Sequence, residues 1–172
     1  SSAASDVYKR QYLMISGSRR GGQPLNLQGQ WNANIRPAWS SNYTVNINTQ
    51  MNYWGASLCG LQECLEPYLR MVHEVCKRGE KTAKVNYGCR GFACNHNVDL
   101  WRKTAPVIGE SNYMYAPLCG VWLANEIYEH YLNGGLDAER DTVLEIVRQA
   151  ALFIMDYLVL SLIHISEPTR PE

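Results

Sequence analysis

Apolar residues recur at three- and four-residue steps along much of the chain, and this spacing predicts helices. The clearest stripe is Leu65, Leu69, Val72, Val75 and Cys76, which predicts a helix over residues 65–87. Similar patterns predict helices over residues 51–61, 114–133 and 137–159. No segment alternates with a period of two, as a half-buried strand would. The predicted fold class is therefore all-α.

Glycine, proline and aspartate predict where these helices begin, weaken and end. Pro67 fits the first turn of the helix over 65–87, where its missing N–H costs nothing. Gly79 is expected to weaken that helix and Gly88 to stop it. Gly134 and its neighbour close the next helix, and Asp137 is a plausible N-cap for the last.

Two long loops separate the predicted helices. The first covers residues 12–43 and is rich in Gly, Ser, Asn and Pro, but its aromatic residues favour an ordered structure. The second covers residues 89–113 and gathers polar and aromatic side chains in a short span: His96, Asn97, Asp99, Trp101 and Glu110.

The junction between the first loop and the first helix carries the most distinctive motif, VNINTQMNYW, over residues 45–54. In an extended segment, residues two apart point to the same side, so the carboxamides of Asn46 and Asn48 are expected to share one face. Ligand-contacting groups are commonly placed at the ends of such elements. The pair is therefore a candidate functional site.

The two ends of the chain are related as inverted copies in DNA. DVYKRQ, residues 6–11, can be encoded so that its reverse complement translates as LSLIHI, residues 160–165. Both ends look like translated adapters from sequencing libraries. We therefore expect segments 1–11 and 160–172 to be non-native and exclude them from fold reasoning. The native part, 12–159, is then expected to be a piece of a longer domain.

Composition excludes several classes of partner. The chain has 46% hydrophobic and 19% charged residues and a formal net charge of +0, which gives no electrostatic footprint for nucleic acid or membrane surfaces. No apolar run reaches the roughly 18 residues that a membrane span needs. We expect no nucleic-acid partner and no membrane partner. Localisation is undetermined.

The six cysteines are predicted to be buried free thiols. They form no Cys-x-x-Cys pair, and Cys89, Cys94 and His96 lack zinc-finger spacing. Several lie among apolar residues of the predicted helices, where a free thiol behaves as a small hydrophobe. Neither a metal site nor a cofactor is predicted, although a disulfide or metal remains the alternative.

A neutral sugar is the ligand that matches the loops best. Sugar hydroxyls pair with Asn, His, Asp and Glu, and sugar ring faces stack on Trp and Tyr. Long helices joined by such loops are typical of a helical barrel whose loops meet at one end. The alternative for Trp54 and Trp122 is that both are core residues.

Five motifs in order resemble the α-L-fucosidases of glycoside hydrolase family 95: NLQGQWN, PAW, NYTVNINTQMNYW, HNVDLW and GVWLANEIYEHY. The resemblance covers nearly all of residues 12–159. It implies part of an (α/α)6 barrel, inverting hydrolysis of terminal α-1,2-linked L-fucose, and a fucosylated glycan as substrate. Some relatives act on α-L-galactosides. A secreted or periplasmic location is compatible with the family.

The resemblance also assigns roles. It implies that Asn46 and Asn48 hold the attacking water. An amide cannot take the proton from that water, so two acids are needed besides the amides. In the family the general acid lies in a Ser-Pro-Glu-Asn motif downstream, and the assisting Asp lies farther still; Ser166-Glu167-Pro168 has the wrong order. We therefore expect this chain alone to be inactive.

Candidate sugar-binding residues are His96, Asn97, Asp99, Glu110 and Trp122. Each has a structural alternative: Asp99 is equally suited to anchor its own loop, and His96 to be a hydrogen-bonded structural histidine. Glu126 and Glu129, near His130, are predicted to be scaffold or solvated residues.

Two alternative functions remain open at this point. One is another helical-barrel glycosidase, and the other is a non-catalytic sugar-binding helical domain. Gln50 stands where the family pattern leads us to expect Glu, and Gly55 where we expect Pro. An incomplete barrel would expose apolar stripes, so we expect poor solubility.

Overall fold

The computed structural model describes residues 3–165, with side chains described for residues 3–158. It contains the helices α1 (Ala3–Gly17), α2 (Asn48–Tyr53), α3 (Glu66–Thr82), α4 (Ser111–Met114), α5 (Cys119–Leu132) and α6 (Arg140–Ile165). The strands are β1 (Tyr43–Thr44) and β2 (Asn97–Val98). Short 3-10 turns cover Ala38–Ser41, Gln62–Leu65 and Asp137–Glu139, and a π-helical turn covers Ala83–Tyr87. The predicted mainly helical class is confirmed.

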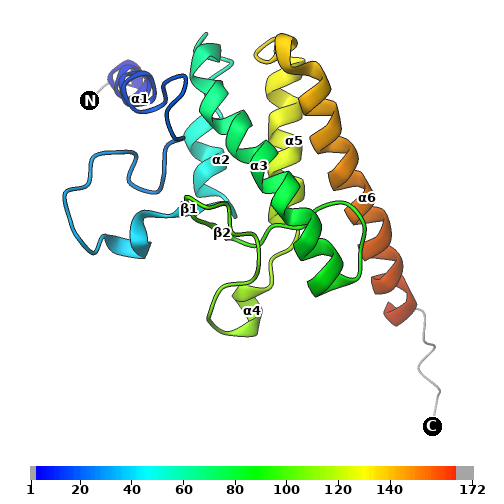
Figure 1. Ribbon diagram of the computed structural model, residues 1–172. Coiled ribbons are helices and arrows are strands. Elements are labelled where there is room, and N and C mark those ends of the chain that lie inside the picture. Colours follow the sequence, from blue (N-terminus) through cyan, green and yellow to red (C-terminus); the bar gives the residue numbers. More distant parts are fainter. Residues whose placement is uncertain (1–2, 166–172) are drawn as a thin grey trace.

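Three long helices form the body of the molecule (Figure 1). α5 packs against both α3 and α6, and α3 also contacts α6. The chain runs down α3, up α5 and down α6 in the view of Figure 1, so the turns before α3 and after α5 lie at the upper end. The two strands and α4 lie toward the lower end. Closure of these helices into a barrel remains a prediction.

The predicted stripe of α3 forms much of the core. Leu69, Val72, Val75 and Cys76 are buried, and Tyr68 between them is fully buried. The Tyr68 ring stacks on Tyr53 from α2 at a centroid distance of 4.4 Å. Burying one such side chain stabilises the fold by about 1.5–3 kcal/mol. The stripe of α6 is buried in its first half, at Val143, Ile146 and Ala150.

Gly79 lies inside α3, and its expected weakening of the helix remains a prediction. The helix runs through it, and the loop after α3 packs directly against it: an added Cβ would lie 2.7 Å from the carbonyl oxygen of Ala93 and 3.0 Å from the Phe92 ring. The glycine allows this close approach. Pro67 does lie in the first turn, and Gly88 ends the helical segment in a left-handed conformation (φ 65°), as predicted.

Three helix boundaries differ from the prediction. The helix predicted over residues 51–61 is α2, which begins at Asn48 and ends at Tyr53, and residues 54–60 form turns. The helix expected from 114 begins at Cys119 instead, after the separate helix α4, and Leu118 pairs with Cys94 in an isolated bridge just before α5. Asp137 lies inside a 3-10 turn whose N-cap is Leu136, without a side-chain cap.

A two-stranded antiparallel sheet joins the two long loops, although no strand was predicted. Tyr43 pairs with Val98, and Thr44 pairs with Asn97. Strands of two residues are too short to show an alternating pattern, which explains the wrong prediction. The sheet matters because it brings the Asn46 motif beside the His96 loop.

The segments predicted to be non-native lie partly within the described chain. α1 continues through the expected junction after Gln11, and α6 continues through residue 165. Residues 166–172, which include the Ser166-Glu167-Pro168 sequence, lie outside the described residues. The division at residues 11 and 160 remains a prediction.

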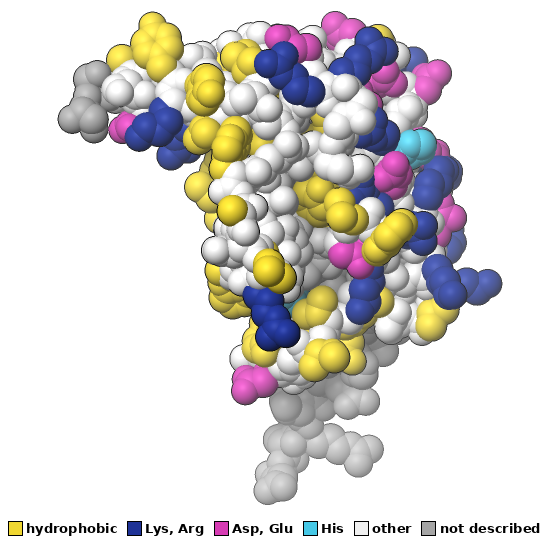
Figure 2. Space-filling model, turned by 60° about the vertical axis from the view of Figure 1, so that its left-hand side comes forward, with side chains coloured by type: hydrophobic (Ala, Val, Ile, Leu, Met, Phe, Trp, Pro, Cys, Tyr) yellow, Lys and Arg dark blue, Asp and Glu magenta, His cyan; other side chains and the backbone are white. Residues whose placement is uncertain are grey.

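Exposed apolar side chains are spread over the face shown in Figure 2. The most exposed large ones include Ile35, Trp39, Leu58, Trp101 and Ile108. Of the six free cysteines, five are buried and Cys59 is exposed. Burial raises the pKa of the Cys76 thiol to about 12, which keeps it protonated. Within the described chain, no helix is long and apolar enough to cross a membrane.

Candidate active site

Asn46 and Asn48 lie on an exposed turn between β1 and α2. Asn46 is in the turn and Asn48 is the first residue of α2, so the expected extended segment is not present. Ile47 between them is also exposed. Neither carboxamide has a hydrogen-bond partner among the described residues. The two amides are therefore close in sequence, accessible and uncommitted.

Buried polar side chains directly after the amides fix this turn. Gln50 Nε2 donates to the carbonyl of Val45 at 2.6 Å, and Thr49 Oγ1 donates to the carbonyl of Thr44 at 2.9 Å. On the other side, the backbone N–H of Val45 donates to the carbonyl of His96 at 2.7 Å. Gln50 is completely buried, and its Oε1 has no partner. Sequence reasoning treated Gln50 only as a departure from a family pattern and missed this anchoring role.

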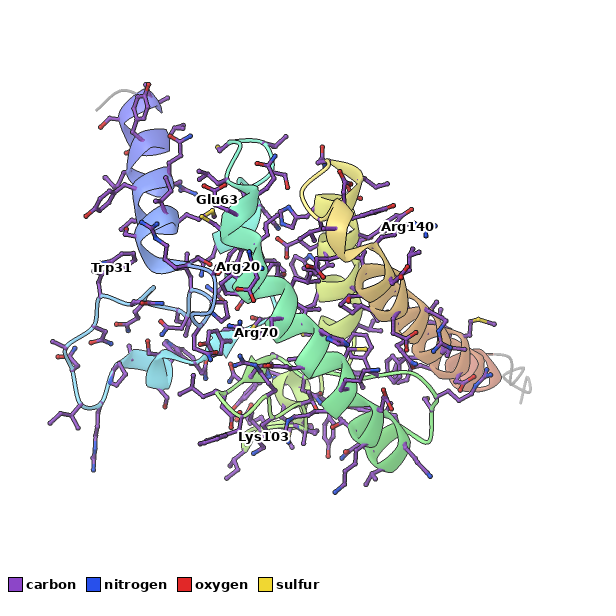
Figure 3. All side chains as sticks on the ribbon, turned by 45° about the horizontal axis from the view of Figure 1, so that its top comes forward. Arg20, Trp31, Glu63, Arg70, Lys103 and Arg140 are labelled. Atoms are coloured by element: carbon purple, nitrogen blue, oxygen red, sulfur yellow. The ribbon has the colours of Figure 1, made fainter. Side chains whose placement is uncertain are left out.

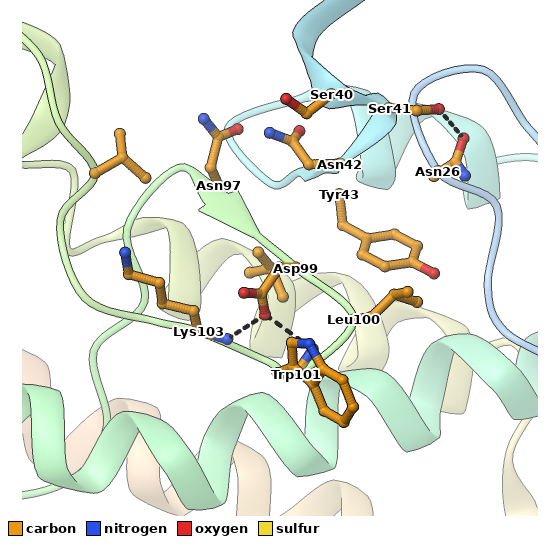
Figure 4. A pocket seen from close by; sticks show the side chains of 12 residues that line it. Asn26, Ser40, Ser41, Asn42, Tyr43, Asn97, Asp99, Leu100, Trp101 and Lys103 are labelled. Atoms are coloured by element: carbon orange, nitrogen blue, oxygen red, sulfur yellow. Dashed lines mark hydrogen bonds between the residues drawn. The ribbon is translucent and has the colours of Figure 1, made fainter. Parts of the chain in front are cut away.

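A cavity of about 520 Å³ opens beside the β1–β2 sheet (Figure 4). Its lining is neutral polar and aromatic for the most part, with one carboxylate and one ammonium group. It includes Asn97 and Asp99 of the predicted sugar-binding residues. The other lining residues include Asn26, Ser40, Ser41, Asn42, Tyr43, Leu100, Trp101 and Lys103.

Asp99 anchors its own loop. Its Oδ1 accepts hydrogen bonds from the backbone N–H groups of Trp101 and Lys103, both at 2.9 Å, as drawn in Figure 4. The structural alternative for Asp99 is therefore confirmed, while its second oxygen stays available at the cavity. The Thr44 hydroxyl lies 2.8 Å from Asn42 Oδ1 and 3.2 Å from Asn97 Oδ1, and the NH₂ group of Asn97 stays available.

Arg102 ties this loop to the rest of the fold, and sequence reasoning missed it. The side chain is buried; Nε pairs with Glu74 Oε2 of α3 at 2.7 Å, and Nη2 donates to Gln23 Oε1 of the first loop at 2.6 Å. The guanidinium also lies 5.6 Å from the centre of the Tyr43 ring. A buried arginine with several partners holds segments far apart in sequence together.

His96 lies next to the amide turn but does not line the cavity. Its ring makes an edge contact with Tyr113, with centroids 6.2 Å apart, and its buried Nδ1 has no partner. Burial lowers the pKa of the imidazole, which favours the neutral form. A neutral ring with a free nitrogen is able to donate or accept one hydrogen bond.

Glu110 and Trp122 are not brought into the described cavity. Glu110 is exposed at the N-cap of α4, and Trp122 lies in the first turn of α5 with 36% of its surface exposed. Trp54 is 49% exposed. Both tryptophans are therefore surface residues rather than core residues. α4 lies at the same end of the molecule as the two strands in Figure 1.

Glu126 and His130 form a buried polar cluster within the helical body, apart from the cavity. Tyr68 donates to Glu126 Oε2, and His130 Nδ1 lies 2.9 Å from Ser57 Oγ. Desolvation raises the pKa of Glu126 to about 8, although the hydrogen bond from Tyr68 acts to lower it. Desolvation also lowers the pKa of His130 to about 4. Both groups are thus neutral near pH 7. This confirms a scaffold role for Glu126, while Glu129 is exposed.

The helical body carries loops whose amide, hydroxyl and aromatic groups line this cavity, and such groups are able to form hydrogen bonds and ring contacts with a neutral ligand. Residues 7–168 match the Glycosyl hydrolase family 95 catalytic domain. The chain belongs to this family.

Similar curated proteins include "Alpha-L-fucosidase 2" of Arabidopsis thaliana, which is 43% identical over 120 residues, or 70% of this chain and 14% of the relative. "Probable alpha-fucosidase A" of Aspergillus niger is 34% identical over 151 residues, or 86% of this chain and 19% of the relative. Its counterpart in Aspergillus oryzae is 32% identical, over 77% of this chain and 20% of the relative. The chain spans about a fifth or less of the length of these relatives.

Proposed function

We propose that this chain supplies the water-holding part of an inverting α-L-fucosidase active site, with Asn46 and Asn48 as the residues that hold the attacking water. The observation that carries the proposal is a pair of uncommitted carboxamides on a turn fixed from beneath by Gln50 and Thr49. Family membership and the names of the relatives support a fucoside as the substrate class.

The chemistry defines what the amides do. In inversion, water attacks the anomeric carbon from the face opposite the leaving oxygen, so the catalytic groups stand about 6.5–9.5 Å apart. Each amide oxygen accepts a hydrogen bond from the water and aims its lone pair, which lowers the entropic part of the barrier. A carboxylate must still remove the proton, and a carboxylic acid must protonate the leaving oxygen.

In this proposal neither Asp99 nor Glu126 serves these roles. One oxygen of Asp99 is committed to backbone amides of its loop, and Glu126 is buried and protonated near pH 7. We therefore propose that the general acid and the base lie outside this chain, which is inactive alone.

The cavity beside the sheet is the proposed sugar site. Its volume lies within the range of about 300–1,000 Å³ that is common for ligand pockets. Asn97 and the free oxygen of Asp99 are placed to bind hydroxyl groups, and Trp101 offers a ring face. His96, Glu110 and Trp122 are proposed to contact more distant parts of a terminal α-1,2-fucosylated glycan. No nucleic acid or membrane is part of this proposal.

A chimera tests the proposal. Residues 12–159 replace the corresponding segment of the Arabidopsis relative, and hydrolysis of 2′-fucosyllactose is measured for the chimera and for this chain alone. We expect turnover by the chimera with inverted configuration of the released fucose, and none by the chain alone. Turnover by the isolated chain, or retention of configuration in the chimera, would contradict the proposal.

A further inference from the structure

A second cavity, of about 370 Å³, lies against the end of α3 and has a positively charged lining. Four of its lining residues are basic, namely Arg78, Lys81, Arg102 and Lys103, and none is acidic. The whole chain has 16 basic and 16 acidic residues, so a purely basic lining is a local feature rather than a reflection of composition.

Three of these cations are available to a ligand, because Lys103, like Arg78 and Lys81, is exposed and forms no ion pair with a described residue. The guanidinium of Arg102 is already committed to Glu74 and Gln23. Arg78 and Lys81 lie three residues apart on α3, so they share one side of the helix, and both are exposed. Neither forms an ion pair with a described residue. Glu74, the acid that pairs with Arg102, has no oxygen among the lining groups.

The second cavity adjoins the proposed sugar site. Trp101 and Lys103 line both cavities, and Trp101 is 78% exposed. Figure 4 shows the Trp101 ring over the ribbon of α3, and Figure 3 shows Lys103 beside the same helix. Buried Thr82 and Thr104 also line the second cavity, with their hydroxyl oxygens 2.6 Å apart. A ligand that extends past Trp101 would therefore pass from neutral to basic surroundings.

We infer that the second cavity is a subsite for an anionic group, a sulfate ester or carboxylate, on a glycan whose neutral sugar occupies the first cavity. This inference rests on the proposed sugar-binding function. The cations of Arg78 and Lys81 form charge-assisted hydrogen bonds with the anion's oxygens, and Trp101 stacks on the sugar between the two cavities. A glycan is favoured over a free anion because the neutral cavity adjoins the basic one.

A matched pair of ligands tests the subsite: one fucosylated oligosaccharide with and without a single sulfate ester. Dissociation constants for this chain are measured by NMR titration in dilute buffer. We expect the sulfated ligand to bind about fivefold to tenfold more tightly, since two partly exposed charge pairs contribute modestly. The difference should shrink in 0.5 M NaCl, where the Debye length falls to a few ångströms.

Two double variants distinguish binding at the subsite from nonspecific attraction of an anion to a basic helix. Arg78→Gln with Lys81→Gln should remove the preference and leave binding of the neutral ligand unchanged. Lys77→Gln with Lys84→Gln removes two exposed charges from the same helical segment outside the cavity, and should keep the preference. Far-ultraviolet circular dichroism of each variant checks that the helices are intact.

The outcomes distinguish this inference from the proposed function. Equal binding of both ligands, or a preference that survives the Arg78 and Lys81 changes, overturns the subsite while the sugar site stands. Complete displacement of the sulfated oligosaccharide by inorganic sulfate would identify a site for free anions. It would overturn the inference that the anion is part of a glycan. Binding of neither ligand would contradict the sugar site and the subsite together.

Discussion

The helical body and the loop-bearing end of this molecule differ in where their polar side chains lie. The body buries them, whereas the loop end places exposed polar side chains beside buried ones. Between α3 and α5, Tyr68, Glu126 and His130 are buried; Tyr68 donates to Glu126, and both Glu126 and His130 are neutral near pH 7. At the loop end, Gln50, Thr49 and Arg102 are buried and hold backbone or neighbouring segments. Asn46, Asn48 and Trp101 stay exposed beside them. The side chains proposed to act on the sugar are thus held in place by residues that need not touch the ligand.

The largest difference between the two regions should appear on aromatic truncation. Tyr68→Ala removes the ring stacked on Tyr53 and leaves Glu126 without its hydrogen bond, so we expect a loss of about 3–5 kcal/mol in the free energy of unfolding. Trp101→Ala, at an exposed ring, should cost less than about 1 kcal/mol but weaken sugar binding. Urea titrations measure both. A larger loss for Trp101→Ala would reverse the comparison.

The buried pair predicts a pH dependence of stability. Unfolded Glu126 titrates near 4.5 and folded Glu126 near 8, whereas His130 titrates near 6.5 unfolded and near 4 folded. Between about pH 4.5 and 6.5 each state binds one proton, so the pair contributes little slope. Between about pH 6.5 and 8 only the folded state keeps its proton, on Glu126, so stability falls as the pH rises.

Between about pH 6.5 and 8 the free energy of unfolding should fall by about 2 kcal/mol, because a difference of one bound proton changes it by about 1.4 kcal/mol per pH unit. Thermal unfolding from pH 6 to pH 8.5 measures the fall in Tm. Glu126→Gln keeps the shape of the side chain without the titration and should remove the slope. An equally steep slope in Glu126→Gln would show that another group is responsible.

A smaller effect on stability is expected from Gln50, but it should reach the site. Gln50→Leu keeps the size of the side chain and removes the hydrogen bond to Val45, while also removing an unpartnered buried oxygen. We expect a loss of about 1 kcal/mol or less in unfolding free energy. In the chimera, kcat should fall with little change in KM, because the turn that carries the amides is less constrained. An unchanged kcat would contradict the claim that Gln50 positions the turn that carries the two amides.

The helices were predictable because their apolar spacing is long and regular. The stripe of α3 follows directly from this spacing, and Pro67 and Gly88 indicated the start of α3 and the end of the π-helical turn that continues it. The misjudged features depend on contacts between distant segments. The close packing of Phe92 and Ala93 against Gly79 is one such contact, and a two-residue strand has no pattern of its own.

The site was predictable in part. Asn46, Asn48, Asn97 and Asp99 stood out as polar residues in aromatic surroundings. The sheet brings their segments together, and of the four only Asn97 and Asp99 line the cavity. Gln50 and Arg102 were missed because their roles are defined by partners far away in sequence or by the backbone. The position of Gln50 directly before the aromatic and apolar residues from Met51 onward was the one local signal for the first. For Arg102 the sequence offers no such signal.

The most direct measurement is kcat for hydrolysis of 2′-fucosyllactose by the chimera with Asn46→Ala and, separately, Asn48→Ala. We expect each substitution to lower kcat about 100-fold or more, as loss of one preorganised hydrogen bond at a reacting centre does. KM should change little. Asn34→Ala, at an exposed asparagine of the first loop, is the matched control and should leave kcat unchanged. Wild-type kcat in both amide variants would contradict the account.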